Sequence, residues 1–558
     1  MTRWIRPTLV CLVLVSLGAC QGGEPPAVAP VHRPRLLDGL GEIHHPISTS
    51  NELAQRYFDQ GLALAFGFNH DGAIDAFREA ARLDPKCAMC WWGVAFAAGP
   101  NINAPMGPDA ARVAYDAAQQ AQRLAEHASP AERAWIAAIQ TRYAADAEAT
   151  AGAAGAANRV ALDRAFADAM RGVWQAHPGD ADAAAIYAES LLDLSPWNYW
   201  QDDGAPREFT NEAAAAIEAA LAIHPDHTGA LHYKIHLYER FEPEKAEPAA
   251  DRLAVQAPAA GHLVHMPAHI YYRVGRYQDS FDINEQAAAS DVAYFAWCRA
   301  SPAYAASYYT HNLHFLWASA LAQGRSDAAL TAARRLTAHI APVDLAAFPF
   351  LEDFLATPLY TFARFGRWDA ILAEPAPPEG QRFVAAIRHY ARGLAFVRRG
   401  DLPAADVEAA ALAAIAATPA VAGMGFDTSG GTAGQRLDVA RHHLAGEIAF
   451  ARGDRKQAEA ELVAGIAIQD ALPYAEPPPF YFPLRQALGV VLLESGRAAD
   501  AEAVYREDLR QHPRNGWSLL GLSQSLAKQG HYGPAQYARK GFQNAWERAD
   551  VPLERSRF

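Results

Sequence analysis

Seven histidines between residues 228 and 315 lie in three short segments, at intervals of three or four residues within each. This spacing places the side chains of each segment on one face of a helix. Neutral imidazole is the commonest protein ligand for transition metals, and an i, i+4 pair on a helix can hold one ion. The pattern therefore predicts a transition-metal site, with copper or zinc favoured. The seven residues are His232, His236, His262, His265, His269, His311 and His314.

The residues beside these histidines favour a soft or borderline ion. Met266 adds a thioether that together with imidazole suits copper, whereas histidines alone suit zinc, copper, nickel or iron. Carboxylates are sparse and Glu239 is the nearest, which disfavours a hard ion such as calcium. Two alternatives to a metal site stay open: the imidazoles form hydrogen bonds with one another, with water or with a bound peptide, or they form a pH-responsive surface.

Two further groups are weaker candidates for chemistry. His443 and Glu447 are four residues apart and form a second polar pair on one helical face. Cys87 and Cys90 form a CxxC motif at a predicted helix start. Outside the cytoplasm this motif fits a disulfide, a redox pair or a copper site with Met89, and two small packing residues would fit the pattern equally well.

The elements that position these residues are predicted to be helices. Hydrophobic residues make up 51% of the 558 residues and charged residues 20%, alanine is abundant, and no alternating strand-like runs occur. The fold class is therefore all-α. The formal net charge is −13, and no basic stripe with interleaved aromatic residues is present. Nucleic acid is accordingly not an expected partner.

The N-terminus has the layout of an export signal. Arg3 and Arg6 precede an apolar run, Leu9–Leu17, that is too short to span a bilayer. The order Leu17-Gly18-Ala19-Cys20 is similar to a bacterial lipoprotein signal, which implies cleavage after residue 19 and lipidation of Cys20. We expect a periplasm-facing lipoprotein of the cell envelope that contacts the membrane only through its lipid anchor. The uncharged Gln21 favours the outer membrane of a Gram-negative cell.

Internal repeats organise the rest of the chain. In a unit that begins at Ala54, small, aromatic and proline residues fall at positions 4, 8, 20, 24, 27 and 32, and this order resembles the tetratricopeptide repeat (TPR), a helix pair of roughly 34 residues. A unit that begins at Phe482 repeats the pattern. We expect about ten to twelve such pairs, stacked as a right-handed superhelical solenoid. The residues of the first unit are Tyr57, Gly61, Ala73, Phe77, Ala80 and Pro85.

The chain is divided at composition shifts. We expect a signal peptide at 1–19, a tether and N-terminal segment at 20–50, an N-terminal TPR array at 51–373 and a C-terminal array at 374–558. The Pro-rich segment Glu374–Gly380 is the expected joint between the arrays. The Ala/Gly-rich segment Ala147–Asn158 and the Gly-rich segment Thr418–Gln435 are expected to be loops.

The repeat phase places the histidines in one groove. Turn glycines and Pro225 set the starts of three successive units at Thr228, Gly261 and Thr310. The TPR resemblance implies that positions 2, 5 and 9 of each first helix line the concave groove, and seven of these nine positions hold histidine. The imidazoles are therefore expected to converge on one region of that groove.

Short motifs outside the repeats add a family resemblance. They are Leu36–Gly41, Glu42–Pro46, Gly99–Asn103, Ser195–Trp200 and the region Pro477–Trp517. With the repeats, they resemble an uncharacterised family of exported bacterial TPR lipoproteins, which implies the fold and the exported location but no activity.

Two functional hypotheses follow from the sequence. The first is a lipid-anchored scaffold that binds a protein or peptide partner in its groove and carries a transition-metal site made by the groove histidines. The alternative is a metal-dependent enzyme of unknown reaction that uses the same histidines. No HExxH-type motif or nucleophile–base pair supports the alternative.

Overall fold

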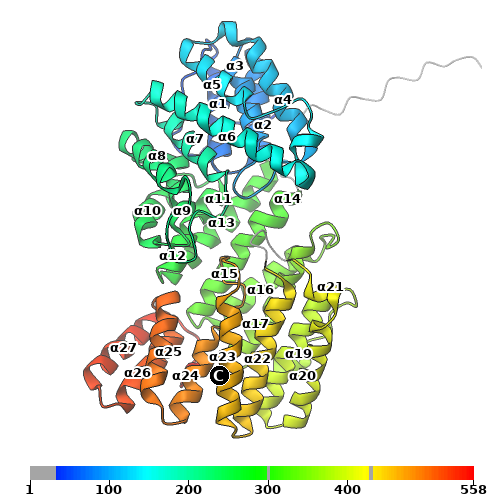
Figure 1. The fold of residues 1–558 in the computed structure, drawn as a ribbon, viewed down its shortest axis with the longest axis vertical. Coiled ribbons are helices and arrows are strands. Elements are labelled where there is room, and N and C mark those ends of the chain that lie inside the picture. Colours follow the sequence, from blue (N-terminus) through cyan, green and yellow to red (C-terminus); the bar gives the residue numbers. More distant parts are fainter. Residues whose placement is uncertain (1–32, 298–301, 426–430) are drawn as a thin grey trace, which may run out of the picture. The chain divides into compact units, whose positions relative to one another are not determined.

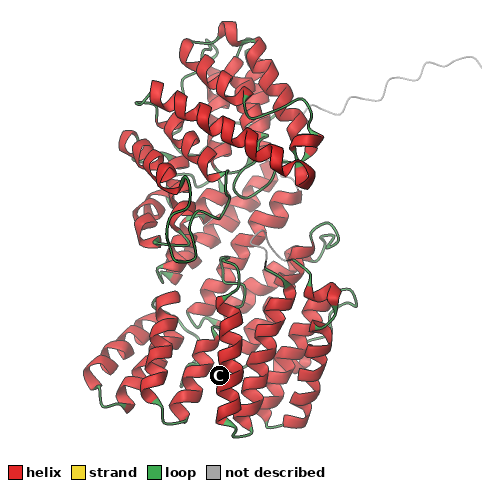
Figure 2. Cartoon of the chain, viewed as in Figure 1, coloured by secondary structure: helices red, strands yellow, loops and turns green. Residues whose placement is uncertain are grey.

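The structure is a computed structural model that describes residues 33–297, 302–425 and 431–558. Across these ranges all regular elements are helices, and extended contacts are limited to three isolated bridges, which confirms the all-α fold (Figure 2). The residues from Pro34 to Phe558 form one compact unit. The expected signal peptide and Cys20 lie outside the described residues, so lipidation stays a prediction. None of the described helices is both long and apolar enough to cross a membrane.

The helices are labelled in Figure 1. The first group is α1 (Glu52–Phe66), α2 (His70–Leu83), α3 (Ala88–Ala97), α4 (Pro108–Arg123), α5 (Pro130–Gln140), α6 (Gly152–Ala176), α7 (Ala181–Leu192), α8 (Thr210–Ile223), α9 (Thr228–Tyr238), α10 (Glu247–Leu253), α11 (Gly261–His265), α12 (Pro267–Arg273), α13 (Tyr277–Trp297) and α14 (Pro302–Tyr304). The second group is α15 (Thr310–Ala322), α16 (Ser326–Ile340), α17 (Thr357–Arg364), α18 (Trp368–Ala373), α19 (Arg382–Arg399), α20 (Leu402–Ala416), α21 (Pro419–Ala422), α22 (Ala433–Ala451), α23 (Arg455–Asp470), α24 (Leu484–Glu494), α25 (Ala498–Gln511), α26 (Gly516–Lys528) and α27 (Tyr532–Ala545).

Successive helices pack as pairs, as the TPR-like repeat predicts. The pairs include α1 with α2, α19 with α20, α22 with α23 and α26 with α27. The packing depends on small residues opposite aromatic ones. A Cβ atom added at Gly61 or Gly93 would lie 2.6 or 2.4 Å from the ring of Phe77, so glycine lets α1 and α3 approach α2 closely. The fold is a solenoid of TPR-like helix pairs.

Glycines in the left-handed region end the first helices of many pairs. At Gly275, φ is +79°, and a Cβ atom there would lie 2.3 Å from the Pro513 carbonyl oxygen. Both facts require glycine at this turn. Seven glycines that follow helices share this conformation: Gly275, Gly324, Gly366, Gly400, Gly453, Gly496 and Gly530.

The hydrophobic core divides at α15. Phe315 belongs to the core cluster of the first helices, whereas Leu316 and Trp317 belong to the cluster formed by the later helices. In Figure 1 the same helix stands where the two groups of helices meet. The Pro-rich segment 374–380 instead connects α18 and α19, which pack against each other. The division into arrays at residues 373 and 374 stays a prediction.

Two predicted loops contain more helix than expected. In the segment Ala147–Asn158, α6 begins at Gly152, because the alanine content outweighs the glycines. In the segment Thr418–Gln435, α21 forms near the start and α22 begins at Ala433, where Thr432 and Gln435 form a capping box. Residues 426–430 of this segment lie outside the described residues.

Candidate metal centre

Four helices carry the seven histidines, and local signals fix where those helices begin and end. His227 caps α9: its Nδ1 accepts a hydrogen bond from the Ala230 N–H at 3.1 Å, and its Nε2 lies 3.0 Å from Asp182 Oδ1. Helix α9 then presents His232 and His236 one turn apart. Helices α11 and α12 are separated at Met266 and Pro267, because proline supplies no backbone N–H.

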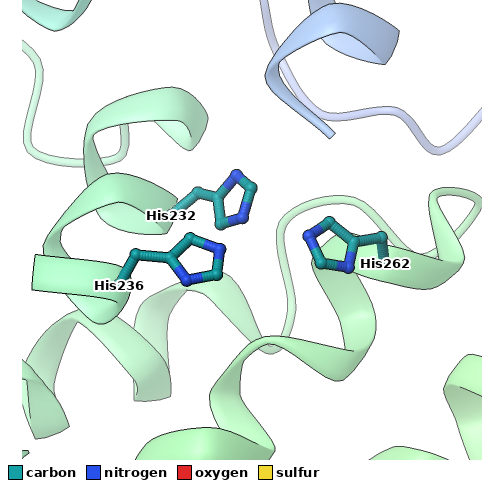
Figure 3. Close-up of side chains that lie close together, drawn as sticks. All are labelled: His232, His236 and His262. Atoms are coloured by element: carbon teal, nitrogen blue, oxygen red, sulfur yellow. The ribbon is translucent and has the colours of Figure 1, made fainter. Parts of the chain in front are cut away.

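Three of the histidines form a first triad. His232 and His236 of α9 face His262 of α11 across a common space (Figure 3). One nitrogen of each lies within 4.8 Å of the others. The three side chains are almost fully enclosed, with exposed fractions of 0%, 2% and 2%. The geometry of this first triad is that of a site able to hold one ion.

Hydrogen bonds orient the first triad and leave nitrogens unpaired. His232 Nδ1–H donates to the Phe66 carbonyl at 2.7 Å, and His236 Nδ1–H donates to Glu239 Oε1 at 3.1 Å. The Nε2 atoms of both residues and both nitrogens of His262 are buried without a hydrogen-bond partner. Each such buried polar atom costs about 1–3 kcal/mol. A bound metal ion would satisfy the inward-facing nitrogens.

Aromatic rings on unusual backbone conformations enclose the first triad. Phe68 and Trp197 both lie in the left-handed region, with φ of +56° and +62°. The Phe68 ring centroid lies 4.7 Å from that of His232 and 5.4 Å from that of His262, and the Trp197 ring lies 5.0 Å from that of His236. Strained backbone of this kind is commonly kept at functional sites. Trp197 belongs to the Ser195–Trp200 motif singled out in the sequence.

His265, His269 and His311 form a second triad. His265 Nδ1–H donates to Asn284 Oδ1 at 2.7 Å, and Asn284 Nδ2 donates to the Ser280 carbonyl, which fixes the orientation of the amide. The Nε2 atom of His265 is therefore the unprotonated nitrogen. It lies 3.0 Å from His269 Nε2, which is 3.4 Å from His311 Nε2. His265 and His269 are buried, and His311 is partly exposed.

Glu239 lies between the two triads. Its Oε1 atom accepts from His236 Nδ1, and its Oε2 atom lies 2.9 Å from His269 Nδ1. Glu476 Oε2 also lies 3.2 Å from His269 Nδ1. A carboxylate behind a ligating histidine orients the ring and increases its basicity, as in many metal sites. Glu239 can do this for one histidine of each triad.

The electrostatics of the centre follow from burial and these carboxylates. Burial lowers the pKa of His232, His262 and His265 well below the usual range, which keeps them neutral as metal binding requires. Burial also disfavours the charged form of His269, but Glu239 and Glu476 outweigh this and raise its pKa to about 10. Burial raises the pKa of Glu476 to about 7.

A cavity of about 820 Å³ borders both triads. His236 and His262 of the first triad and His269 and His311 of the second line its wall, whereas His232 and His265 lie behind them. Asn101 and Asn103, from the Gly99–Asn103 motif, line it as well. The remaining wall includes charged residues such as Asp71, Asp353 and Arg436, together with nine aromatic residues: Phe68, Trp197, Tyr294, Tyr304, Tyr308, Phe350, Phe354, Tyr474 and Tyr481.

A segment far along the chain borders the cavity beside the histidines. Three residues between α23 and α24 line the cavity: Tyr474, Glu476 and Tyr481. Glu476 contacts His269, and Tyr481 contacts His314. The histidines were expected to converge on one region of the concave groove, and in the structure most of them are buried beneath neighbouring segments.

Two of the predicted metal ligands lie outside both triads. His314 lines the cavity, but its Nε2 is hydrogen-bonded to the Tyr481 hydroxyl at 3.0 Å and its ring packs against Phe354. Met266 is fully buried in the hydrophobic core around α11 and α12.

The other candidate residues have partners of their own. Cys87 and Cys90 form a buried disulfide at the start of α3, so of the alternatives left open the structure contains the disulfide. His443 Nδ1 is 2.7 Å from the Tyr390 hydroxyl, and Glu447 pairs with Arg398 and Arg557. The His443–Glu447 pair lines a separate small pocket.

Sequence reasoning missed most of the residues that support the triads. Glu239 was noted only as the nearest carboxylate, although its place three residues after His236 is a signal for a shared helix face. Asn284, Glu476 and the Phe66 carbonyl are distant in sequence from the histidines they contact. Only the tertiary structure brings these groups to the site.

Comparisons with known proteins add a general likeness of fold. No family model matches the chain, and no curated protein matches it. The human IFIT1 dimer with PPP-AAAA is similar over 90% of this chain and 94% of that chain, at 12% identity and a TM-score of 0.31. The APC/C hetero-tetramer Cut9–Hcn1 is similar over 90% of this chain and 91% of that chain, at 12% identity and a TM-score of 0.29. At these TM-scores the likeness supports no conclusion about partners or activity.

Proposed function

We propose that this protein is a TPR-like scaffold that binds a transition-metal ion through the first triad, His232, His236 and His262. The observation that carries the proposal is the set of inward-facing nitrogens that are buried without a hydrogen-bond partner. Two of the rings are held in the tautomer that leaves Nε2 free, by the Phe66 carbonyl and by Glu239. Oriented neutral imidazoles backed by acceptors are typical of metal sites.

Zinc and copper fit this donor set best. Three imidazole nitrogens and no carboxylate or thiolate ligand in the triad suit borderline ions, and oxygen-seeking ions such as calcium do not fit. Three protein ligands also leave a fourth tetrahedral position. Because two of the three rings line the cavity, that position would border the cavity.

Metal analysis of tag-free protein tests this proposal. We expect bound zinc or copper in the wild-type protein and loss of the ion from this centre in His262→Ala. This variant removes no hydrogen bond, because neither ring nitrogen of His262 has a partner. His443→Ala is the matched control and should keep the metal content of the wild type. Wild-type protein without metal, and without uptake on titration with Zn²⁺ or Cu²⁺, would refute the proposal.

A metal-dependent enzyme is the second candidate function. It is favoured by the three-ligand triad beside an aromatic-lined cavity of about 820 Å³, since catalytic metal sites keep a position open for substrate or water. The test uses azide as a small anionic ligand. Azide should change the absorption spectrum of the Cu²⁺-loaded protein if the open position exists, and an unchanged spectrum would exclude this candidate.

We also propose that the scaffold is held in the cell envelope by lipidation at Cys20 and presents its helix pairs to a protein or peptide partner. The supports are the signal-like N-terminus and the helix-pair fold. Cys20→Ala should move the protein from the membrane fraction to the soluble fraction. An equal distribution of the wild type and the variant would remove the anchor from the proposal.

A further inference from the structure

We infer that the protein binds a second transition-metal ion, held by the second triad of His265, His269 and His311 and coupled to the first ion through Glu239. This inference rests on the proposed function, because it adds a second ion beside the one that His232, His236 and His262 would hold. The expected ligand is the same class of borderline divalent ion, Zn²⁺ or Cu²⁺.

The spacing of the nitrogens in the second triad matches metal coordination. Two nitrogens bound to one tetrahedral ion at about 2.0–2.1 Å lie about 3.3–3.4 Å apart. The Nε2 atoms of His265 and His269 are 3.0 Å apart, and those of His269 and His311 are 3.4 Å apart. All three ligand atoms lie within 4.8 Å of one another. One ion can therefore contact all three rings with small adjustments of the side chains.

A hydrogen bond to His265 and ion-pair contacts with His269 orient the second triad. Asn284 accepts from His265 Nδ1, which turns the Nε2 lone pair of His265 toward the other two rings. Nδ1 of His269 faces Glu239 and Glu476, which turns its Nε2 toward the same space. Each triad thus has an acceptor behind two of its rings, and in each triad two rings border the cavity.

Glu239 gives the two centres a shared support. Its two oxygens lie 3.1 Å from Nδ1 of His236 in the first triad and 2.9 Å from Nδ1 of His269 in the second. The carboxylate is buried, so its orientation is fixed by these two contacts. An ion at one triad would hold the carboxylate in the position that the other triad needs, which predicts cooperative loading.

The competing arrangement is an ion pair without a second metal. A protonated His269 between Glu239 and Glu476 can donate from Nε2 to His265 and satisfy part of the cluster. This arrangement and the second metal centre differ in stoichiometry. The ion pair leaves one metal site in the chain, whereas the second triad makes two.

The number of metal ions bound per chain distinguishes the second metal centre from the ion pair. It also distinguishes both of them from failure of the proposed function. Tag-free protein stripped by a chelator is titrated with Zn²⁺, dialysed and analysed for bound metal. We expect two ions per chain in the wild type and in His443→Ala, one in His311→Ala and one in His262→Ala. His311 is the chosen ligand because it is partly exposed, and His311→Asn replaces the first variant if circular dichroism shows that His311→Ala is unfolded.

Each outcome decides between the hypotheses. One ion in the wild type that is lost in His262→Ala, or an unchanged metal content in His311→Ala, overturns the second centre and leaves the first. One ion that is lost in His311→Ala and kept in His262→Ala overturns the first centre instead. Loss of both ions from folded His311→Ala overturns the assignment of separate triads. No bound metal in any protein overturns the proposed function as well.

Discussion

The histidine pair of α9 and the His443–Glu447 pair of α22 have the same spacing, but their surroundings differ. On α9, the inward nitrogens of His232 and His236 have no hydrogen-bond partner. On α22, the Tyr390 hydroxyl contacts His443, and two arginines pair with Glu447. In both regions the two side chains share one helix face. The candidate metal centre differs because its inward-facing imidazole nitrogens have no hydrogen-bond partner.

The comparison shows that spacing alone does not identify a ligand. An i, i+4 pair tells which side chains share a face. Whether they bind an ion depends on the groups opposite, which either use up the hydrogen-bonding atoms or orient them toward an empty space. Residues behind the rings, such as Phe66 and Glu239, are therefore as informative as the histidines.

The largest expected effect is the loss of stability when metal is removed. An ion at a free concentration a thousand times its Kd stabilises the folded state by about 4 kcal/mol, so chelation should lower the Tm of the wild type clearly. Thermal unfolding with and without EDTA measures this shift. His443→Ala should show the same shift and His262→Ala a smaller one. Equal shifts in wild type and His262→Ala would break the comparison between the two regions.

The next effect concerns the ion pairs of α22. Glu447→Ala leaves Arg557 buried without its partner and should cost about 3 kcal/mol of unfolding free energy, without changing metal content. The pKa of Glu447, which burial alone would raise, is lowered to about 2 by Arg398 and Arg557, in agreement with this strong pairing. Thermal unfolding and metal analysis of the same preparation test both statements. Reduced metal content in folded Glu447→Ala would show that the two regions are not independent.

The smallest expected effect is a change in metal affinity when Glu239 loses its charge. Glu239→Gln keeps the shape of the side chain but removes its charge, and supporting residues of this kind change metal affinity about 10–100-fold. We expect weaker binding at both triads in competition titrations with a chromophoric chelator. Glu408→Gln is the matched control, because Glu408 accepts from His389 at 2.6 Å in the same way, away from the triads. Equal affinity in Glu239→Gln and the wild type would remove Glu239 from the centre.

Much of the fold could be predicted because its signals are local. The pair Gly61 and Phe77 indicates a close contact between the two helices of one repeat. Gly275 indicates a left-handed turn at the end of a helix. The prediction of a loop at Ala147–Asn158 was only partly correct, because an alanine-rich sequence favours helix even where it contains glycines.

Less of the candidate site could be predicted, because its supports are not local. The repeat phase predicted that the histidines converge on one region. It did not predict that six of them form two triads or that His314 lies outside both. The contacts of Asn284 and Glu476 with His265 and His269 join segments whose separation in the chain gives no periodic signal.

The sequence by itself determined the helix pairs and the shared face of each histidine segment, since both depend on residue spacing within one or two helices. The tertiary structure alone decided which nitrogens are free. Burial beneath Phe68 and residues 474–481, and the acceptors at Phe66, Glu239 and Asn284, depend on segments that meet only when the chain is folded. Ligand atoms are defined by their neighbours in space, and neighbours in space are set by packing.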